Sequence, residues 1–236
     1  MKPFETTAIA LLSSGLDSAV SMAFALAKGI HIKSAITFDY GQRAAIQEIQ
    51  HAKAISDYFG VSHEVMPLPW FSQFESKGLL SKKDPLAHPS LKTLSDSGAV
   101  LKSAAQVWVP NRNGVFLEVA ASIAENQKVT TILVGFNAEE AVTFPDNSIA
   151  YIEAINKALA LSTSNHVRVE SPTMEMNKTE IVALGITLNF PFSLLWSCYE
   201  EGDVMCGSCE SCMRLKRALV NQEKSLDGLF INTILN

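Results

Sequence analysis

The sequence lacks the features that mark membrane, secreted and nucleic-acid-binding proteins. No apolar run reaches the roughly 18 residues that a membrane-spanning helix needs. The first residues, MKPFETTAIALLSSG, contain no cleavage pattern of a secretory signal. With 19 basic and 24 acidic residues, the formal net charge is −5, so the chain has no basic surplus with which to hold a phosphate backbone. We therefore expect a cytoplasmic protein that binds neither membranes nor nucleic acid.

Cysteine is also scarce, and its four residues all lie between positions 198 and 212. A disulfide framework would distribute cysteines along the chain, whereas a close cluster without an export signal indicates a metal site in a reducing compartment. Cys198 precedes the triplet Cys206, Cys209 and Cys212, whose members are each separated by two residues. Four thiolates complete the tetrahedral shell of a structural zinc ion. The alternatives are an iron–sulfur cluster, whose ferredoxin motifs carry a similar triplet but place the fourth cysteine after it, and free or redox-active thiols.

The remaining sequence predicts a globular α/β protein, because 47% of its residues are hydrophobic and 18% are charged. Apolar and β-rich runs alternate with segments of helical spacing, which predicts a parallel five-stranded sheet with helices on both faces. We expect this α/β domain to span residues 1–189, with residues 68–108 forming an irregular excursion, and a zinc-binding segment to span residues 190–236 and pack on it. Strands are expected at 8–12, 30–38, 62–66, 129–134 and 167–169, and helices at 17–28, 43–59, 113–126, 148–161 and 177–184.

A loop of small residues, Ser-Ser-Gly-Leu-Asp-Ser at 13–18, separates the first strand from the first helix. Small residues let the backbone approach an anion, and the unpaired amides and dipole of a helix N-terminus favour a phosphate there. Ser13 and Ser18 could donate hydroxyl groups, and Asp17 could hold magnesium on the phosphates. The alternative is a serine that caps an ordinary helix. The loop is neither a Walker A motif nor a dinucleotide-binding fingerprint.

This loop resembles the Ser-Gly-Gly-x-Asp-Ser signature of the PP-loop ATP pyrophosphatases, with Ser14 in place of the first glycine. Five later segments resemble, in the same order, the QueC (7-cyano-7-deazaguanine synthase) family of these enzymes. They are YGQR at 40–43, VPNRN at 109–113, GFNAEE at 135–140, FPD at 144–146 and KTE at 178–180. The resemblance extends from residue 8 to about residue 220. It departs from the family at Asn111, Asn147 and Ser148, where Gly, Cys and Arg are usual.

The resemblance implies an adenine nucleotide alpha hydrolase-like fold and an ATP-dependent carbon–nitrogen ligase of queuosine biosynthesis. Such an enzyme adenylates 7-carboxy-7-deazaguanine, lets ammonia displace AMP to form an amide, and dehydrates the amide to a nitrile through a second activation. Its cofactors would be Mg²⁺ and Zn²⁺, and its assembly a homodimer. Two alternatives stay open: a related enzyme that adenylates another carboxylate, a protein or a tRNA base, and a non-catalytic nucleotide-binding module.

The resemblance also implies roles for individual residues. Cationic side chains would offset phosphate charge, and polar residues after the fourth strand would contact substrate; the alternatives are surface ion pairs and loop capping. The ATP-binding set is Leu12, Ser13, Ser14, Gly15, Leu16, Asp17, Ser18, Phe38, Arg43 and Arg112; the substrate-binding set is Tyr40, Gln42, Asn137, Glu139, Phe144 and Asp146; and the catalytic set is Asp17, Arg112 and Lys178.

Overall fold

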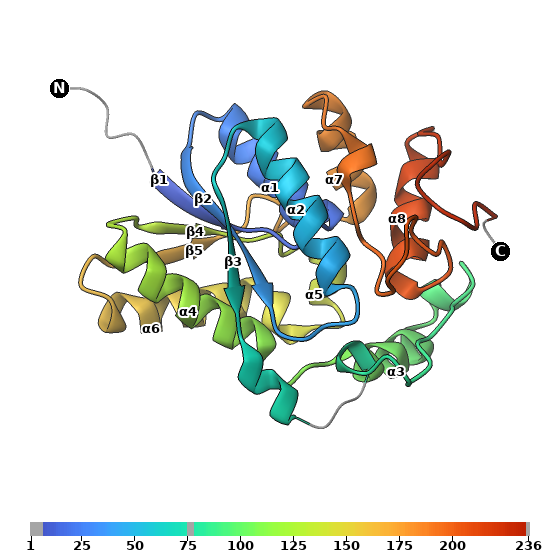
Figure 1. The fold of residues 1–236 in the computed structure, drawn as a ribbon, viewed down its shortest axis with the longest axis horizontal. Coiled ribbons are helices and arrows are strands. Elements are labelled where there is room, and N and C mark those ends of the chain that lie inside the picture. The colour runs from blue at the N-terminus through green and yellow to red at the C-terminus, as the bar shows by residue number, and fades with distance from the viewer. Residues whose placement is uncertain (1–6, 75–77, 235–236) are drawn as a thin grey trace.

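A computed structural model describes residues 7–74 and 78–234 and contains one parallel sheet of five strands (Figure 1). The strand order is β3-β2-β1-β4-β5, so the chain moves outward from β1 to β3 and then returns to the other side of β1. This reversal creates a switch point between β1 and β4, where ligands bind in open α/β sheets. The strands are β1 Thr7–Leu11, β2 His31–Asp39, β3 His63–Pro67, β4 Thr131–Leu133 and β5 Arg168–Glu170.

Helices cover both faces of the sheet, as predicted, and each face has its own apolar core. Ala8 and Ala10 of β1 belong to the core beneath α1, α2 and α7, whereas Ile9 between them belongs to the core beneath α4 and α6. This alternation buries the middle of the central strand on both faces, because successive side chains of a strand point to opposite faces. The helices are α1 Leu16–Ala27, α2 Ala45–Phe59, α4 Arg112–Asn126, α6 Ile149–Ser162 and α7 Lys178–Thr187.

The stretch 68–108 is more ordered than expected. It contains three short 3-10 helices, η1 Pro69–Gln73, η2 Gly78–Leu80 and η3 Thr93–Ser95, and one α-helix, α3 Ser97–Val107. The prediction of irregular structure was therefore wrong for α3, whose sequence SGAVLKSAAQV is dominated by small residues and shows no broad apolar stripe. Residues 75–77 of this stretch lie outside the described residues.

The cysteine-rich end of the chain packs beside the sheet rather than on a separate body. Its helix α8, Glu210–Asn221, contacts α7, and α3 lies near the loops that precede α8 (Figure 1). Several of its apolar side chains, including Leu215 and Leu219, belong to the same core as α1 and α7. Within residues 7–74 and 78–234, no helix has the length and apolar character needed to cross a membrane.

Candidate active site at the carboxyl ends of the strands

A cavity of about 270 Å³ lies where β1, β2 and β4 end, at the switch point of the sheet. Its wall is completed by the N-termini of α1, α4 and α7 and by residues 196–199. Most predicted site residues line it: Leu12, Ser13, Gly15, Leu16, Asp17, Ser18, Phe38, Tyr40, Gln42, Arg43, Arg112, Phe144 and Lys178. Ser14, Asn137, Glu139 and Asp146 are absent from its lining.

The loop at residues 13–18 forms the sharp turn that the sequence predicted. Gly15 is the N-cap of α1 and has no side chain to occupy the amides of the first turn, which border the cavity. Ser13 and Ser18 place their hydroxyl oxygens 3.1 Å apart across the loop, and Ser18 Oγ also accepts the Ser13 amide at 3.2 Å. The geometry is that of a small anion-binding nest at a helix N-terminus.

Two departures from the family pattern occur where the backbone is left-handed. Ser14 has a φ of 61° and Asn111 a φ of 49°. Glycine adopts this region readily, and asparagine tolerates it better than most residues, which explains why glycine is usual at both positions. Ser14 is fully buried, and its hydroxyl donates to Ser13 O at 2.6 Å and to Trp196 O at 3.2 Å.

Gly135 explains how the loop after β4 approaches the phosphate loop. A Cβ atom at this position would lie 2.3 Å from the amide nitrogen of Ser18 and 2.6 Å from the carbonyl carbon of Asp17. Any side chain would therefore push the loop away from the first turn of α1. Glu140, which follows five residues later in the short helix Ala138–Ala141, lines the same cavity.

A cluster of one lysine and two carboxylates borders the cavity beside α1. Lys178 Nζ is 2.6 Å from Asp17 Oδ2 and 2.7 Å from Glu140 Oε1. Lys178 is the first residue of α7, and a capping box of Asn177 and Glu180 fixes the start of that helix. Because one ammonium group faces two carboxylates, the cluster carries a net negative charge when all three groups are ionised.

The titration of this cluster follows from burial and from the shared lysine. Burial raises the pKa of Asp17 to about 6, although Lys178 opposes the shift. Burial also raises the pKa of Glu140, but Lys178 outweighs it and leaves that pKa below its usual value. Burial would lower the pKa of Lys178, yet the two carboxylates raise it, so the lysine stays protonated.

Asp17 has the donor geometry expected of a magnesium ligand. Within the described residues, its Oδ1 atom is buried and has no hydrogen-bond partner, whereas Oδ2 binds Lys178. A buried carboxylate oxygen without a partner is costly, and Mg²⁺ is held in nucleotide sites by one or two carboxylates together with phosphate oxygens. Asp17 therefore fits a divalent cation on a phosphate chain.

The opposite wall of the cavity combines aromatic rings with a second charged group. Phe38 and Phe116 stack with their ring centroids 4.2 Å apart, and Tyr40 meets Phe116 edge-on at 5.3 Å. Arg112 Nη1 lies 3.2 Å from the Tyr40 hydroxyl group. This wall offers a flat apolar surface and a cation, which suits an aromatic ring that carries anionic or carbonyl groups.

Glu48 also lines this wall and was not among the predicted residues. Burial raises the pKa of Glu48 to about 7, while a hydrogen bond from Gln42 Nε2 at 2.9 Å and the charge of Arg112 oppose the shift. The signal in the sequence was its spacing: Glu48 lies four residues after Ala44 and four before Ala52, both buried, so it shares the inward face of α2. A charged residue on the inward face of a helix is a candidate functional residue.

Two predicted residues are occupied elsewhere by ion pairs with the cysteine-rich segment. Arg43 lines the cavity, but its guanidinium group lies 2.8 Å from Glu200 and donates to Asp84 O at 2.7 Å. Glu139 accepts from Arg214 at 2.7 Å and from Arg217 at 2.5 Å, both on α8. Arg43 and Glu139 therefore connect the α/β domain to the cysteine-rich segment through ion pairs.

Three further residues after β4 cap helices or lie behind the cavity. Asn137 accepts the Glu140 amide and caps the short helix α5, Ala138–Ala141. Ser148, where the family usually has Arg, caps α6 by accepting the Tyr151 amide, whereas Asn147 lines the cavity. Asp146 lies behind the wall; burial raises its pKa, although the charge of Arg112 opposes the shift.

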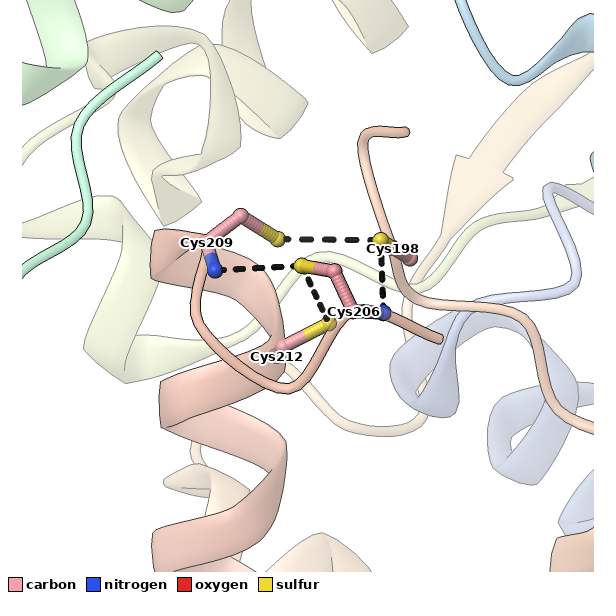
Figure 2. A group of neighbouring side chains, drawn as sticks. All are labelled: Cys198, Cys206, Cys209 and Cys212. Carbon is pink, nitrogen blue, oxygen red and sulfur yellow. Dashed lines mark hydrogen bonds between the residues drawn. The ribbon is translucent and has the colours of Figure 1, made fainter. Parts of the chain in front are cut away.

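The four cysteines converge on one point (Figure 2). All four Sγ atoms lie within 4.8 Å of one another, with Cys198 and Cys209 separated by 4.0 Å and Cys206 and Cys212 by 3.9 Å. A tetrahedral ion with metal–sulfur bonds of about 2.3 Å would separate its sulfurs by about 3.8 Å. The thiols are free, and backbone amides donate to Cys198 and Cys206. The cluster therefore fits one tetrahedral ion, whereas four thiolates on separate irons would lie further apart.

Comparison with known proteins identifies the family of this chain. The sequence profile described as "Queuosine biosynthesis protein QueC" matches residues 7–223. The 7-cyano-7-deazaguanine synthase of Carboxydothermus hydrogenoformans is 47% identical over 89% of this chain and 97% of its own length. The 7-cyano-7-deazaguanine synthase of Methanosarcina barkeri is 44% identical over 91% of this chain and 94% of its own length. Among solved structures, the NMN synthetase of Francisella tularensis covers 96% of this chain and 80% of its own at a TM-score of 0.47 and 16% identity, a likeness from which we infer nothing. The chain belongs to the QueC family of queuosine biosynthesis proteins.

Proposed function

We propose that this chain is a 7-cyano-7-deazaguanine synthase, an ATP-dependent ligase that converts 7-carboxy-7-deazaguanine and ammonia to the corresponding nitrile. The observation that carries the proposal is that one cavity is bordered by an anion-binding helix N-terminus, by cations and by an aromatic wall. A nucleotide and a ring compound can therefore meet there. The names of the relatives at 43–47% identity support the same substrate and product.

The chemical difficulty is that a carboxylate oxygen is a poor leaving group. In the proposed reaction, that oxygen attacks the α-phosphorus of ATP and pyrophosphate leaves. Ammonia then attacks the carbonyl carbon, AMP leaves with the oxygen, and a proton is lost, which yields the amide. The amide oxygen repeats the attack on a second ATP and a second pyrophosphate leaves. AMP then leaves with that oxygen, and both protons of the amide nitrogen are lost, which gives the nitrile. The enzyme contributes mainly orientation and neutralisation of charge.

Particular residues suit these tasks. The first turn of α1 would hold the phosphate chain, and Lys178 and Arg112 would offset its charge. Asp17 would hold Mg²⁺, which supplies charge neutralisation at the phosphate oxygens when bound. Phe38 and Phe116 would pack against a ring. Glu48, with a pKa of about 7, is placed to take up a proton released from nitrogen.

We also infer one structural Zn²⁺ at Cys198, Cys206, Cys209 and Cys212, because four thiolates leave no open position for catalysis. Metal analysis of purified protein should give one zinc per chain, no iron and no visible absorption band. A stoichiometric iron content with acid-labile sulfide would contradict zinc and favour the cluster.

A cytoplasmic location and a homodimer remain predictions. Light scattering tests the second, and the thiolates favour the reducing cytoplasm.

The proposal is tested by incubating zinc-loaded protein with ATP, magnesium, ammonium and 7-carboxy-7-deazaguanine. We expect two AMP and two pyrophosphate for each nitrile formed. Production of AMP only with another carboxylic acid would contradict the substrate and support a related adenylating enzyme. Asn147 motivates a panel of such acids, because it lines the cavity where the family usually has Cys. Nucleotide binding without any AMP would support a non-catalytic module.

A further inference from the structure

The segment that leads into the first cysteine lies directly against the phosphate loop. The Trp196 amide donates to Ser14 O at 3.0 Å, and the Ser14 hydroxyl donates back to Trp196 O at 3.2 Å. Two residues further along the loop and one further along the other segment, the Leu16 amide donates to Ser197 Oγ at 3.4 Å. The loop is therefore held at its left-handed residue and at the start of α1 by a segment that is 182 positions away.

The clamping segment is itself fixed from two directions. On one side, Trp196 is 3% exposed and packs against the His51 ring at 5.1 Å, and His51 Nδ1 lies 2.8 Å from Leu194 O. On the other side, the Ser197 amide donates to the sulfur of Met205, and Cys198 follows at once. The thiol of Cys198 lies among the other three thiols, so whatever holds the four sulfurs also holds the clamping segment.

The phosphate loop depends on an external clamp because its conformation is strained. A non-glycine residue in the left-handed region persists only where surrounding contacts impose that conformation. At Ser14 the surrounding contacts are the hydrogen bond that the Trp196 amide donates to Ser14 O, and the hydroxyl proton of Ser14, which is shared between Ser13 O and Trp196 O. If residues 194–198 became less ordered, Ser14 could leave the left-handed region. The amides of the first turn of α1 would then no longer point into the cavity.

We propose that the four-cysteine segment positions the phosphate loop, so that metal occupancy and ATP binding are thermodynamically coupled, with Ser14 as the positioning residue that transmits the coupling. The proposal rests on the proposed function, because it requires that the loop bind ATP. Reciprocity makes it quantitative: if zinc raises the affinity for nucleotide by some factor, nucleotide must raise the affinity for zinc by the same factor. If zinc only stabilised the four-cysteine segment itself, it would not change the affinity for nucleotide, and this coupling factor would be one.

The experiment measures the dissociation constant of a non-hydrolysable ATP analogue for zinc-loaded and metal-free protein, by calorimetry. It also measures the affinity of the protein for zinc, by equilibrium competition with a chelator, with and without the analogue. For the wild type we expect nucleotide to bind about tenfold more weakly when zinc is absent, and zinc to bind more tightly by the same factor when nucleotide is present. The second measurement starts from the loaded protein, so it remains informative if the metal-free form unfolds.

Two variants separate coupling from folding. Ser14→Gly keeps the left-handed turn but removes the hydroxyl tether, so we expect the coupling factor to fall toward one while zinc affinity without nucleotide stays unchanged. Ser122→Ala, an exposed serine of α4, is the matched control and should retain the wild-type factor. Equal nucleotide affinity in both metal states, or a zinc affinity that nucleotide does not alter, would overturn the inference. Absence of nucleotide binding by the loaded wild type would instead overturn the proposed function and the inference with it.

Discussion

Lys178 places its ammonium group 2.6 Å from the Asp17 carboxylate, although 161 residues separate the two in sequence. The contact joins the first turn of α1 to the first residue of α7, and Glu140 completes the cluster from the loop after β4. Lys178 thereby restrains one oxygen of Asp17 and leaves the other without a partner at the cavity. Orientation of a metal-binding carboxylate by a neighbouring cation is a simple way to prepare a nucleotide site.

Replacing this lysine should impair both stability and catalysis. Lys178→Met leaves two partly buried carboxylates without their cation, and we expect a loss of up to about 3 kcal/mol in the free energy of unfolding, measured with urea. The rate of AMP formation should fall by at least about 100-fold. Lys53→Met is the control, because Lys53 forms only an exposed pair with Asp57. It should change stability by less than about 0.5 kcal/mol. Comparable effects of both substitutions would contradict a special role for Lys178.

The raised pKa of Asp17 predicts a pH limit for nucleotide binding. With a pKa of about 6, Asp17 is ionised above that pH and protonated below it, and only the ionised form holds magnesium. The affinity for Mg-ATP should therefore be constant above pH 7 and fall about tenfold per pH unit below pH 6. Asp17→Asn should bind weakly at every pH and lose this dependence. A wild-type affinity that stays flat down to pH 5 would show that Asp17 is not the titrating ligand.

The sign of the effect on folding is opposite to that on binding. Because the pKa of Asp17 is higher in the folded protein than its usual value of 3.8, the folded state holds its proton more tightly. Its ionisation therefore lowers stability progressively as pH rises from about 4 to 6, and the penalty persists above pH 6. Bound magnesium should remove this penalty.

Glu48 predicts a second, separate pH effect. Its pKa of about 7 places the carboxylate in the range where a proton acceptor is useful, and it lines the aromatic wall of the cavity. In Glu48→Gln we expect the maximal rate of nitrile formation to fall and its rise between pH 6 and 8 to disappear. The affinity for ATP should remain within about threefold, since Asp17 and the phosphate loop are intact.

Glu153→Gln is the matched control for Glu48, because Glu153 is exposed on α6. Its pH profile should equal that of the wild type. If Glu48→Gln retained the pH-dependent rise, proton transfer would have to be assigned to another group.

Lys216 predicts how strongly the cysteine-rich segment depends on one buried cation. The side chain is fully buried, and its ammonium group donates to Gly207 O at 3.0 Å, Asn232 O at 2.9 Å and Ile234 O at 2.6 Å. Lys216→Met would leave these carbonyl groups without their donor. We expect a loss of about 2–4 kcal/mol and faster removal of zinc by a chelator. Lys157→Met, on the exposed face of α6, should leave both quantities unchanged.

Much of the fold follows from local patterns in the sequence. The strands of a parallel sheet are buried on both faces, so β1 and β4 appear as short apolar runs, and each run is followed by small residues where the chain turns into the cavity. The loop at residues 13–18 was recognisable for the same reason, since glycine and serine at a strand–helix junction either cap the helix or let the backbone approach an anion. Boundaries moved by one to three residues, as at β4, because the outer residues of an apolar run need not pair.

The parts that escaped prediction depend on partners far away in the chain. Glu139 was expected at the substrate but pairs with Arg214 and Arg217, some 75 and 78 residues later, and no local pattern reveals such a pairing. Arg43 meets Glu200 in the same way. The helix α3 was missed because its sequence is dominated by small residues and shows no broad apolar stripe. The sequence shows which side chains are charged, but only the folded structure determines which partner each of them contacts.

The clamp between Ser14 and Trp196 also affects the order of events during synthesis. At about 5–20 residues per second, a ribosome needs roughly 10 to 35 seconds to add the 182 residues that separate the two. During that interval the nascent chain carries its phosphate loop without the segment that shapes it. The proposed nucleotide site is therefore completed only after residues 196–198 have been added, and a chain released before that point would have all five strands of the sheet without the segment that contacts the loop.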